Sequence, residues 1–108
     1  MGFRNDDLMV LAMGGVCLSP PVAEAVVVND RFAMHVCAAL IRHSLGDWGV
    51  LSQQDRECNN IAMQTGLRVV SAHTIPEGLH EEDVLWVVTE GDRAKTSVLF
   101  SKEYRRGE

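Results

Sequence analysis

The run from Arg42 to Gly49, RHSLGDWG, constrains the fold of this chain more than any other segment. It follows a stretch with helical periodicity and places an acid and an indole, Asp47 and Trp48, between two glycines. Glycine adopts backbone angles that other residues avoid. The run therefore predicts a tight corner at 46–49 that follows a helix and fixes the directions of the carboxylate and the indole.

The length and composition predict one globular domain, residues 1–108, with a single modest core. Apolar residues make up 46% of the 108 positions, which is too many for a disordered chain. The 15 acidic residues outnumber the 10 lysines and arginines, and the formal net charge is -5. This charge disfavours direct binding to a nucleic-acid backbone and is compatible with a protein partner.

The cysteines and the first apolar stretch bear on the compartment. Cys17, Cys37 and Cys58 are widely spaced and include no Cys-x-x-Cys pair, so we expect three free thiols in a reducing cytoplasm. The apolar stretch 8–18 is too short to span a bilayer and lacks the positive start of a signal peptide. We therefore expect no membrane association.

The amino-terminal part predicts a polar lead-in at 1–7 and a strand around 16–18. A further strand or a short helix is expected before the glycine pair at 14–15. The Ser-Pro-Pro sequence at 19–21 has the capping hydroxyl and the prolines typical of a helix start. A run of β-branched valines follows, so this helix is expected to end near Val27.

The central helix is expected over residues 31–44, because its apolar positions recur with helical spacing. Further apolar positions widen this stripe, so we expect much of the circumference to be buried. The stripe consists of Phe32, Val36, Ala39, Leu40 and His43, widened by Ala33, Cys37 and Ile41. After the corner, Ser52 and Asp55 have the spacing of a capping box for a helix that Gly66 ends.

The last third is rich in β-branched residues and predicts strands at 67–75, 84–90 and 96–100. The segment 91–94 is expected to form a hairpin turn, and 105–106 a frayed tail. The resulting fold class is α+β, with the helices packed on one face of a small antiparallel sheet and a C-terminal three-strand meander.

A family resemblance covers about residues 30–104. It is carried by Arg42-His43, Gly46-Asp47-Trp48-Gly49, Asp55, Asn59 or Asn60, Gly66-Leu67-Arg68, Ser71, Leu85-Trp86-Val87-Val88-Thr89-Glu90, Asp92-Arg93, Thr96, Leu99 and Glu103-Tyr104. In this order, these residues resemble a family of small, mostly uncharacterised bacterial proteins called plasmid-related proteins. The resemblance implies a setting on plasmids, phages or integrated elements, and it implies no reaction. Gly91, Ala94-Lys95 and Ser101 depart from the family's pattern.

Seven residues form the candidate binding site: His43, Asp47, Trp48, Asp55, Asn59, Asp92 and Arg93. His43 and Asp47 lie four residues apart at a helix end and could meet as an acid–imidazole pair. In the alternative that we favour, His43 caps the last helix carbonyls and Asp47 bonds backbone amides of the corner. Trp48 is either an exposed anchor for a partner or, as we favour, packed over the core with its N–H bonded to a carbonyl.

The remaining candidates are weaker. Glu90 or Asp92 at the hairpin could form a carboxylate metal site with Asp47 or Asp55. An Asp-supported turn with an arginine–carboxylate bridge from Arg93 is the simpler interpretation. Asp55 and Asn59 are expected on the polar side of their helix, for solvation, a bond to the corner or partner recognition. The histidines lack zinc-site spacing, so no metal and no cofactor is predicted.

Three hypotheses about function follow. The first is a non-enzymatic, protein-binding accessory factor of a plasmid, phage or integrated element, which fits the acidic charge and the incomplete catalytic constellation. The alternative is a small hydrolase or nuclease accessory that uses Asp47, His43 and nearby carboxylates, with or without a metal. The third is a homodimer through the sheet edge at 96–100, because a short final strand exposes unpaired backbone groups.

Overall fold

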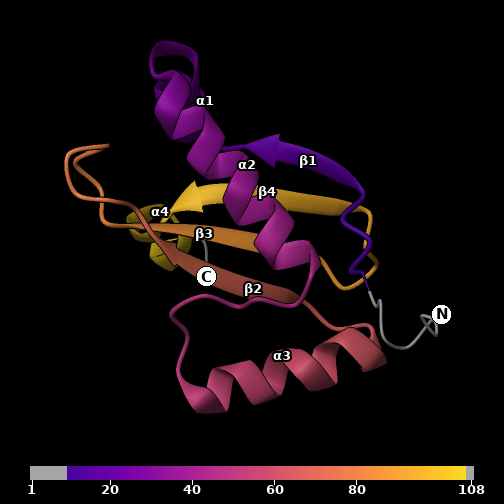
Figure 1. The fold of residues 1–108 in the computed structure, drawn as a ribbon. Coiled ribbons are helices and arrows are strands. Elements are labelled where there is room, and N and C mark those ends of the chain that lie inside the picture. Colours follow the sequence, from indigo (N-terminus) through magenta and orange to yellow (C-terminus); the bar gives the residue numbers. More distant parts are fainter. Residues whose placement is uncertain (1–9, 107–108) are drawn as a thin grey trace, which may run out of the picture.

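A computed structural model describes residues 10–106 of the chain, so the lead-in predicted at 1–7 lies outside the described residues. Residues 10–14 form neither a strand nor a helix. The elements, in chain order (Figure 1), are β1 (Gly15–Leu18), α1 (Pro20–Val28), α2 (Asp30–Ser44), α3 (Gln53–Thr65), β2 (Val69–Thr74), β3 (Val84–Thr89), β4 (Lys95–Phe100) and α4 (Ser101–Arg106).

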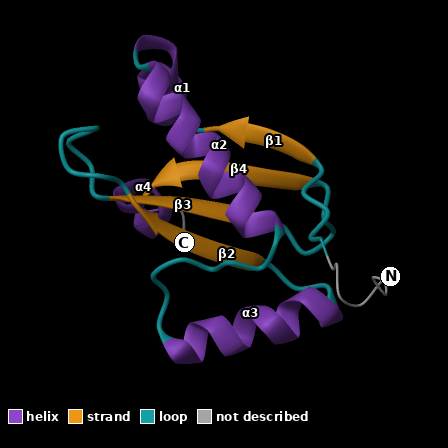
Figure 2. Ribbon diagram, viewed as in Figure 1, coloured by secondary structure: helices purple, strands orange, loops and turns teal. Residues whose placement is uncertain are grey.

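The four strands form one sheet with the order β1-β4-β3-β2 (Figure 2). The C-terminal strands β2, β3 and β4 pair antiparallel in sequence order, while β1 joins β4 in parallel. The α+β fold class is thus confirmed, with a mixed sheet rather than a purely antiparallel one. The prediction that residues 96–100 form an edge of the sheet is wrong, because β4 is paired on both sides. The two edges of the sheet are β1 and β2.

The helices occupy three positions around this sheet. The first two, α1 and α2, cover one face, and α3 lies beside β2 (Figure 1). The short helix α4 lies on the opposite face, where Tyr104 stacks on Trp86 with ring centroids 4.7 Å apart. The main core, beneath α1 and α2, consists of Val22, Ala25, Phe32, Val36, Ala39, Ile75, Leu85, Val87, Val98 and Phe100. A smaller core of Leu11, Trp48, Ala62 and Val69 joins α3 to the corner.

Side-chain caps start the three longer helices, and those of α1 and α3 lie where the sequence predicts. Ser19 and Ser52 accept hydrogen bonds from backbone N–H groups of α1 and α3, and Asn29 does the same for α2. Gly66, in the left-handed conformation, ends α3. The prediction of a frayed tail at 105–106 is wrong, because these two residues form the end of helix α4.

One prediction about α2 is wrong. Cys37 and Ile41 were expected to widen the buried stripe, but both are exposed, Ile41 by 59%. Phe32, Val36 and Ala39 face the sheet, and the helical repeat places Ile41 on the opposite side. Helix α2 therefore has one buried apolar side and one exposed apolar side.

Candidate functional site

The corner after α2 is held by Asp47. Its carboxylate accepts a hydrogen bond from Arg42 Nε at 2.8 Å and another from the backbone N–H of Gly49 at 3.1 Å. The bond from the Arg42 guanidinium lowers the pKa of the Asp47 carboxyl below its usual range. This is the favoured role for Asp47, with Arg42 as a partner that the sequence did not indicate.

Gly49 brings the corner against the outer side of β2. The backbone N–H of Val50 donates to Ala72 O at 2.8 Å, and the N–H of Ala72 donates to Trp48 O at 3.2 Å. Gly49 has φ +74°, and a Cβ at this position would lie 1.8 Å from Ala72 O. Only glycine allows this approach, so Gly49 fixes the corner to the strand edge.

His43 is fully buried and belongs to a chain of hydrogen-bonded side chains beneath α2. Its Nδ1 lies 2.7 Å from Ser71 Oγ, and its Nε2 lies 2.9 Å from Thr89 Oγ1. Ser71 Oγ lies 2.9 Å from His73 Nε2, and Thr89 Oγ1 lies 2.7 Å from Thr96 Oγ1. Both imidazole nitrogens of His43 are therefore occupied, and neither caps α2 nor bonds Asp47, in contrast to both predictions.

The proton positions in this series of hydrogen bonds follow from its last acceptor, the backbone carbonyl of Met13. The hydroxyl of Thr96 donates its single proton to that carbonyl at 2.7 Å. Thr89 must then donate to Thr96, because each hydroxyl has one proton. His43 Nε2 must in turn donate to Thr89, so His43 carries its proton on Nε2.

The same reasoning extends to the other side of His43. Its Nδ1 is the acceptor, so Ser71 donates to it, and His73 Nε2 donates to Ser71. Burial lowers the pKa of both imidazoles to about 4, which keeps them neutral near pH 7 as this order requires. His73 Nδ1 is left as a buried acceptor without a partner among the described residues. The arrangement joins the three C-terminal strands to α2 and has no open reactive group.

Trp48 lies in the smaller core, as favoured. It is 4% exposed, its Nε1 donates to Asn60 Oδ1 at 3.0 Å, and its ring meets the His43 ring edge-on. The indole therefore packs between the corner and α3 and is not available as an exposed anchor.

Asn59 was expected on the polar side of α3, and this prediction is wrong. Its side chain is 5% exposed and forms two hydrogen bonds with the backbone of Val70, donating to the carbonyl at 2.5 Å and accepting from the N–H at 3.1 Å. The amide thus takes the place of a neighbouring strand. Asp55, one turn earlier, is exposed.

The hairpin residues have structural contacts. Asp92 accepts from the N–H of Ala94 at 3.0 Å, which is the expected Asp-supported turn. Arg93 donates to the carbonyls of Ala62, Leu67 and Glu90, so it joins the hairpin to the end of α3. The expected arginine–carboxylate bridge is formed instead by Arg68 and Glu90 at 3.3 Å.

The structure thus divides the seven predicted residues. His43, Asp47 and Trp48 share the corner, and Asn59 closes the edge of β2. Asp92 and Arg93 stabilise the hairpin, and Asp55 is exposed on α3. Sequence reasoning missed four residues of the buried chain: Ser71, His73, Thr89 and Thr96. Their signal was the period-2 alternation in the last third, which places Ser71 and His73 on the buried face. Within residues 10–106, no group of three or more His, Cys, Asp or Glu is arranged to hold a metal ion.

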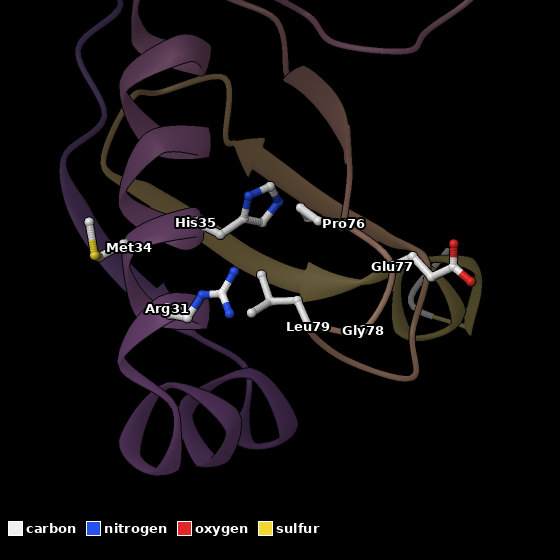
Figure 3. A pocket seen from close by; sticks show the side chains of 7 residues that line it. All are labelled: Arg31, Met34, His35, Pro76, Glu77, Gly78 and Leu79. Carbon is white, nitrogen blue, oxygen red and sulfur yellow. The ribbon is translucent and has the colours of Figure 1, made fainter.

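A hollow of about 490 Å³ lies between α2 and the β2–β3 connection (Figure 3). Its lining residues are Arg31, Met34, His35, Pro76, Glu77, Gly78 and Leu79. In Figure 3, His35 and Arg31 extend from α2 toward the connection, whereas the Glu77 carboxylate points away. Burial lowers the pKa of His35. Arg31 is therefore the one permanently cationic side chain among these lining residues.

Comparison of the chain with protein-family models, with curated proteins and with solved structures finds no match. Among residues 10–106, no helix combines the length and the apolar character needed to cross a membrane.

Proposed function

We propose that this chain is a protein-binding accessory factor and that it binds its partner through the outward side of α2. The observation that carries this proposal is a line of exposed apolar residues along that side: Met34, Cys37, Ala38, Ile41 and Leu45, named here the α2 surface. Met34 is 71% exposed, Ile41 59% and Leu45 60%. A contiguous exposed apolar surface of this kind is characteristic of interaction sites.

The spacing of the α2 surface suits a helical or groove-shaped partner. Its residues recur at three- and four-residue intervals, which is the pattern of anchors that a helix presents to a hydrophobic groove. The small residues Cys37 and Ala38 lie between larger ones, so a second helix could cross closely there. Helix α2 lies on the near side of the sheet, and no other described element covers it (Figure 2).

The setting on a plasmid, phage or integrated element remains part of this proposal and rests on the family resemblance alone. The corner does not favour the alternative of a hydrolase or nuclease accessory. The carboxylate of Asp47 is engaged by Arg42, and His43 is buried and bonded to two hydroxyls. We therefore assign the corner a structural role and the α2 surface the binding role.

The proposal is tested by affinity capture from a bacterial lysate with three forms of the chain. Ile41→Glu places a charge in the α2 surface. Ile61→Glu is the control, because Ile61 lies on α3 and is 61% exposed, as much as Ile41. We expect the same proteins to be recovered by the wild type and Ile61→Glu and to be lost with Ile41→Glu. Equal recovery by both variants, or no specific recovery by the wild type, would refute the α2 surface as the binding site. Circular dichroism verifies that the variants fold.

A further inference from the structure

The outer side of β1 has no paired strand among residues 10–106. On the inner side, the N–H of Gly15 donates to Ala94 O at 3.0 Å and the N–H of Ser19 donates to Val98 O at 2.9 Å. Successive residues of a strand direct their backbone groups to opposite sides, so Val16 and Leu18 direct theirs away from β4. The N–H and C=O groups of these two residues define the open edge.

Among residues 10–106, the shortness of its four-residue strand is the one usual protection that the open edge has. Proteins block edge strands with proline, charged side chains, bulges or a covering element. The sequence of β1 is GVCL, its first three residues are exposed, and Val16 is 45% exposed. No strand lies beyond β1 in the described part of the chain (Figure 2). The edge is therefore a template for an added strand.

We propose that the added strand is β1 of a second copy of this chain, paired antiparallel about a two-fold axis at Cys17. In this register, Val16 lies opposite Leu18 of the second copy, and each pair exchanges both backbone hydrogen bonds. The two Cys17 residues then face each other in a pair without backbone hydrogen bonds. The sheets of the two copies become one continuous sheet.

Charge complementarity favours a second copy as the occupant. Lys95 is paired with Gly15 at one end of β1, and Glu103 accepts from the hydroxyl of Ser19 at the other end. The antiparallel register brings Gly15 of each copy opposite Ser19 of the other. Lys95 and Glu103 line one hollow of about 370 Å³ with Cys17, so all three lie on the same face of the sheet. The register therefore places Lys95 of each copy and Glu103 of the other at the same end of the paired strands and on the same face, twice by symmetry.

The cysteines allow a direct test. In an antiparallel pair without backbone hydrogen bonds, the Cα atoms lie about 4.5 Å apart, within the span of a disulfide. Because Cys17, Cys37 and Cys58 are all exposed, three chains that each retain one cysteine form a matched set. Under mild oxidation, we expect the Cys17 chain to form a covalent dimer at least ten times faster than the others. Equal rates for the three chains would overturn the proposal.

A second test separates pairing from folding. Val16→Pro removes an outward N–H, whereas the bonds to β4 come from neighbouring residues, and proline is tolerated at such edge positions. Val16→Thr keeps the N–H and is the control. By sedimentation at two concentrations, we expect association of the wild type and Val16→Thr and a monomer for Val16→Pro. A monomeric wild type at both concentrations, or an associating Val16→Pro, would refute the open edge as the interface.

The dimer is independent of the proposed function. Ile41→Glu lies on α2 and should leave the sedimentation behaviour unchanged. If the wild type associates but captures no partner, only the proposal for the α2 surface is refuted. If it captures a partner but remains a monomer, only the proposal for the open edge is refuted. A short edge of this kind buries little area, so the dimer is expected to be in exchange with the monomer.

Discussion

The two edge strands of the sheet, β2 and β1, differ in whether their outward backbone groups are hydrogen-bonded. At β2, the side-chain amide of Asn59 bonds the backbone of Val70, and the corner at Gly49 bonds the backbone of Ala72. At β1, no strand among residues 10–106 pairs with the outward groups of Val16 and Leu18. One edge is thus closed by specific side chains and backbone, and the other is left open. The comparison indicates that the closed edge prevents pairing on one side of the sheet and leaves a single side for association.

Among the substitutions, Gly49→Ala should have the largest effect, because it pushes the corner away from the backbone of β2. The added Cβ would meet the Ala72 carbonyl oxygen in a backbone conformation that alanine disfavours. We expect a loss of about 3–5 kcal/mol in the free energy of unfolding, measured with urea. The control is Gly78→Ala, since Gly78 has φ +86° and nothing within 4 Å of the added atom. It should lose only about 1–2 kcal/mol, and equal losses would contradict the proposed contact.

Acid should loosen the β2 side of the sheet through its two buried imidazoles. The unfolded chain binds a proton at each histidine below about pH 6.5, whereas folded His43 and His73 bind one only near pH 4. Stability is therefore complete above about pH 6.5 and declines as the pH falls toward 4, by on the order of 3 kcal/mol for each imidazole.

Urea unfolding at a series of pH values between 7 and 4 measures this decline. A His43→Gln chain retains one of the two imidazoles, so its stability should fall with a shallower slope than that of the wild type. A wild-type stability that does not change over this range would show that these imidazoles are not held neutral in the fold.

Among the substitutions with a predicted loss, Asn59→Ala should have the smallest effect on stability. It removes the two hydrogen bonds to the Val70 backbone, and we expect the free energy of unfolding to fall by about 2 kcal/mol. The exposed Gln64 of the same helix provides the control, because Gln64→Ala should change stability by less than about 0.5 kcal/mol. The corner stays bonded to Ala72 in the Asn59→Ala variant, so Asn59→Ala combined with Val16→Pro should remain a monomer. Equal stability losses for Asn59→Ala and Gln64→Ala would contradict the role of the Val70 bonds.

Local chemistry made part of this molecule predictable. The caps at Ser19, Ser52 and Gly66 and the bond from Asp47 to the corner join residues close in sequence, so residue type and spacing were sufficient. The buried position of Trp48 was favoured because an indole usually packs over a core and bonds a carbonyl through its N–H.

Contacts between distant residues were not predictable. Asn59 lies among polar neighbours on α3, and its acceptor is a backbone group of a strand that follows, so the residue type alone indicated an outward side chain. The partners of His43 lie 28 and 46 residues away along the chain. The pairing of β1 with β4 was also missed, because four small apolar residues carry no information about which strand they join.

The parallel pairing of β1 also bears on the order of folding during synthesis. Gly15 pairs with Lys95, so the two strands meet across 80 positions of chain. Strand β1 leaves the ribosome long before β4, and both of its sides are then unpaired. The pair α1–α2 and the β2–β3 hairpin need only nearby residues and can form earlier. We therefore expect β1 to be the last strand to join the sheet and the segment most exposed to misassociation in the nascent chain.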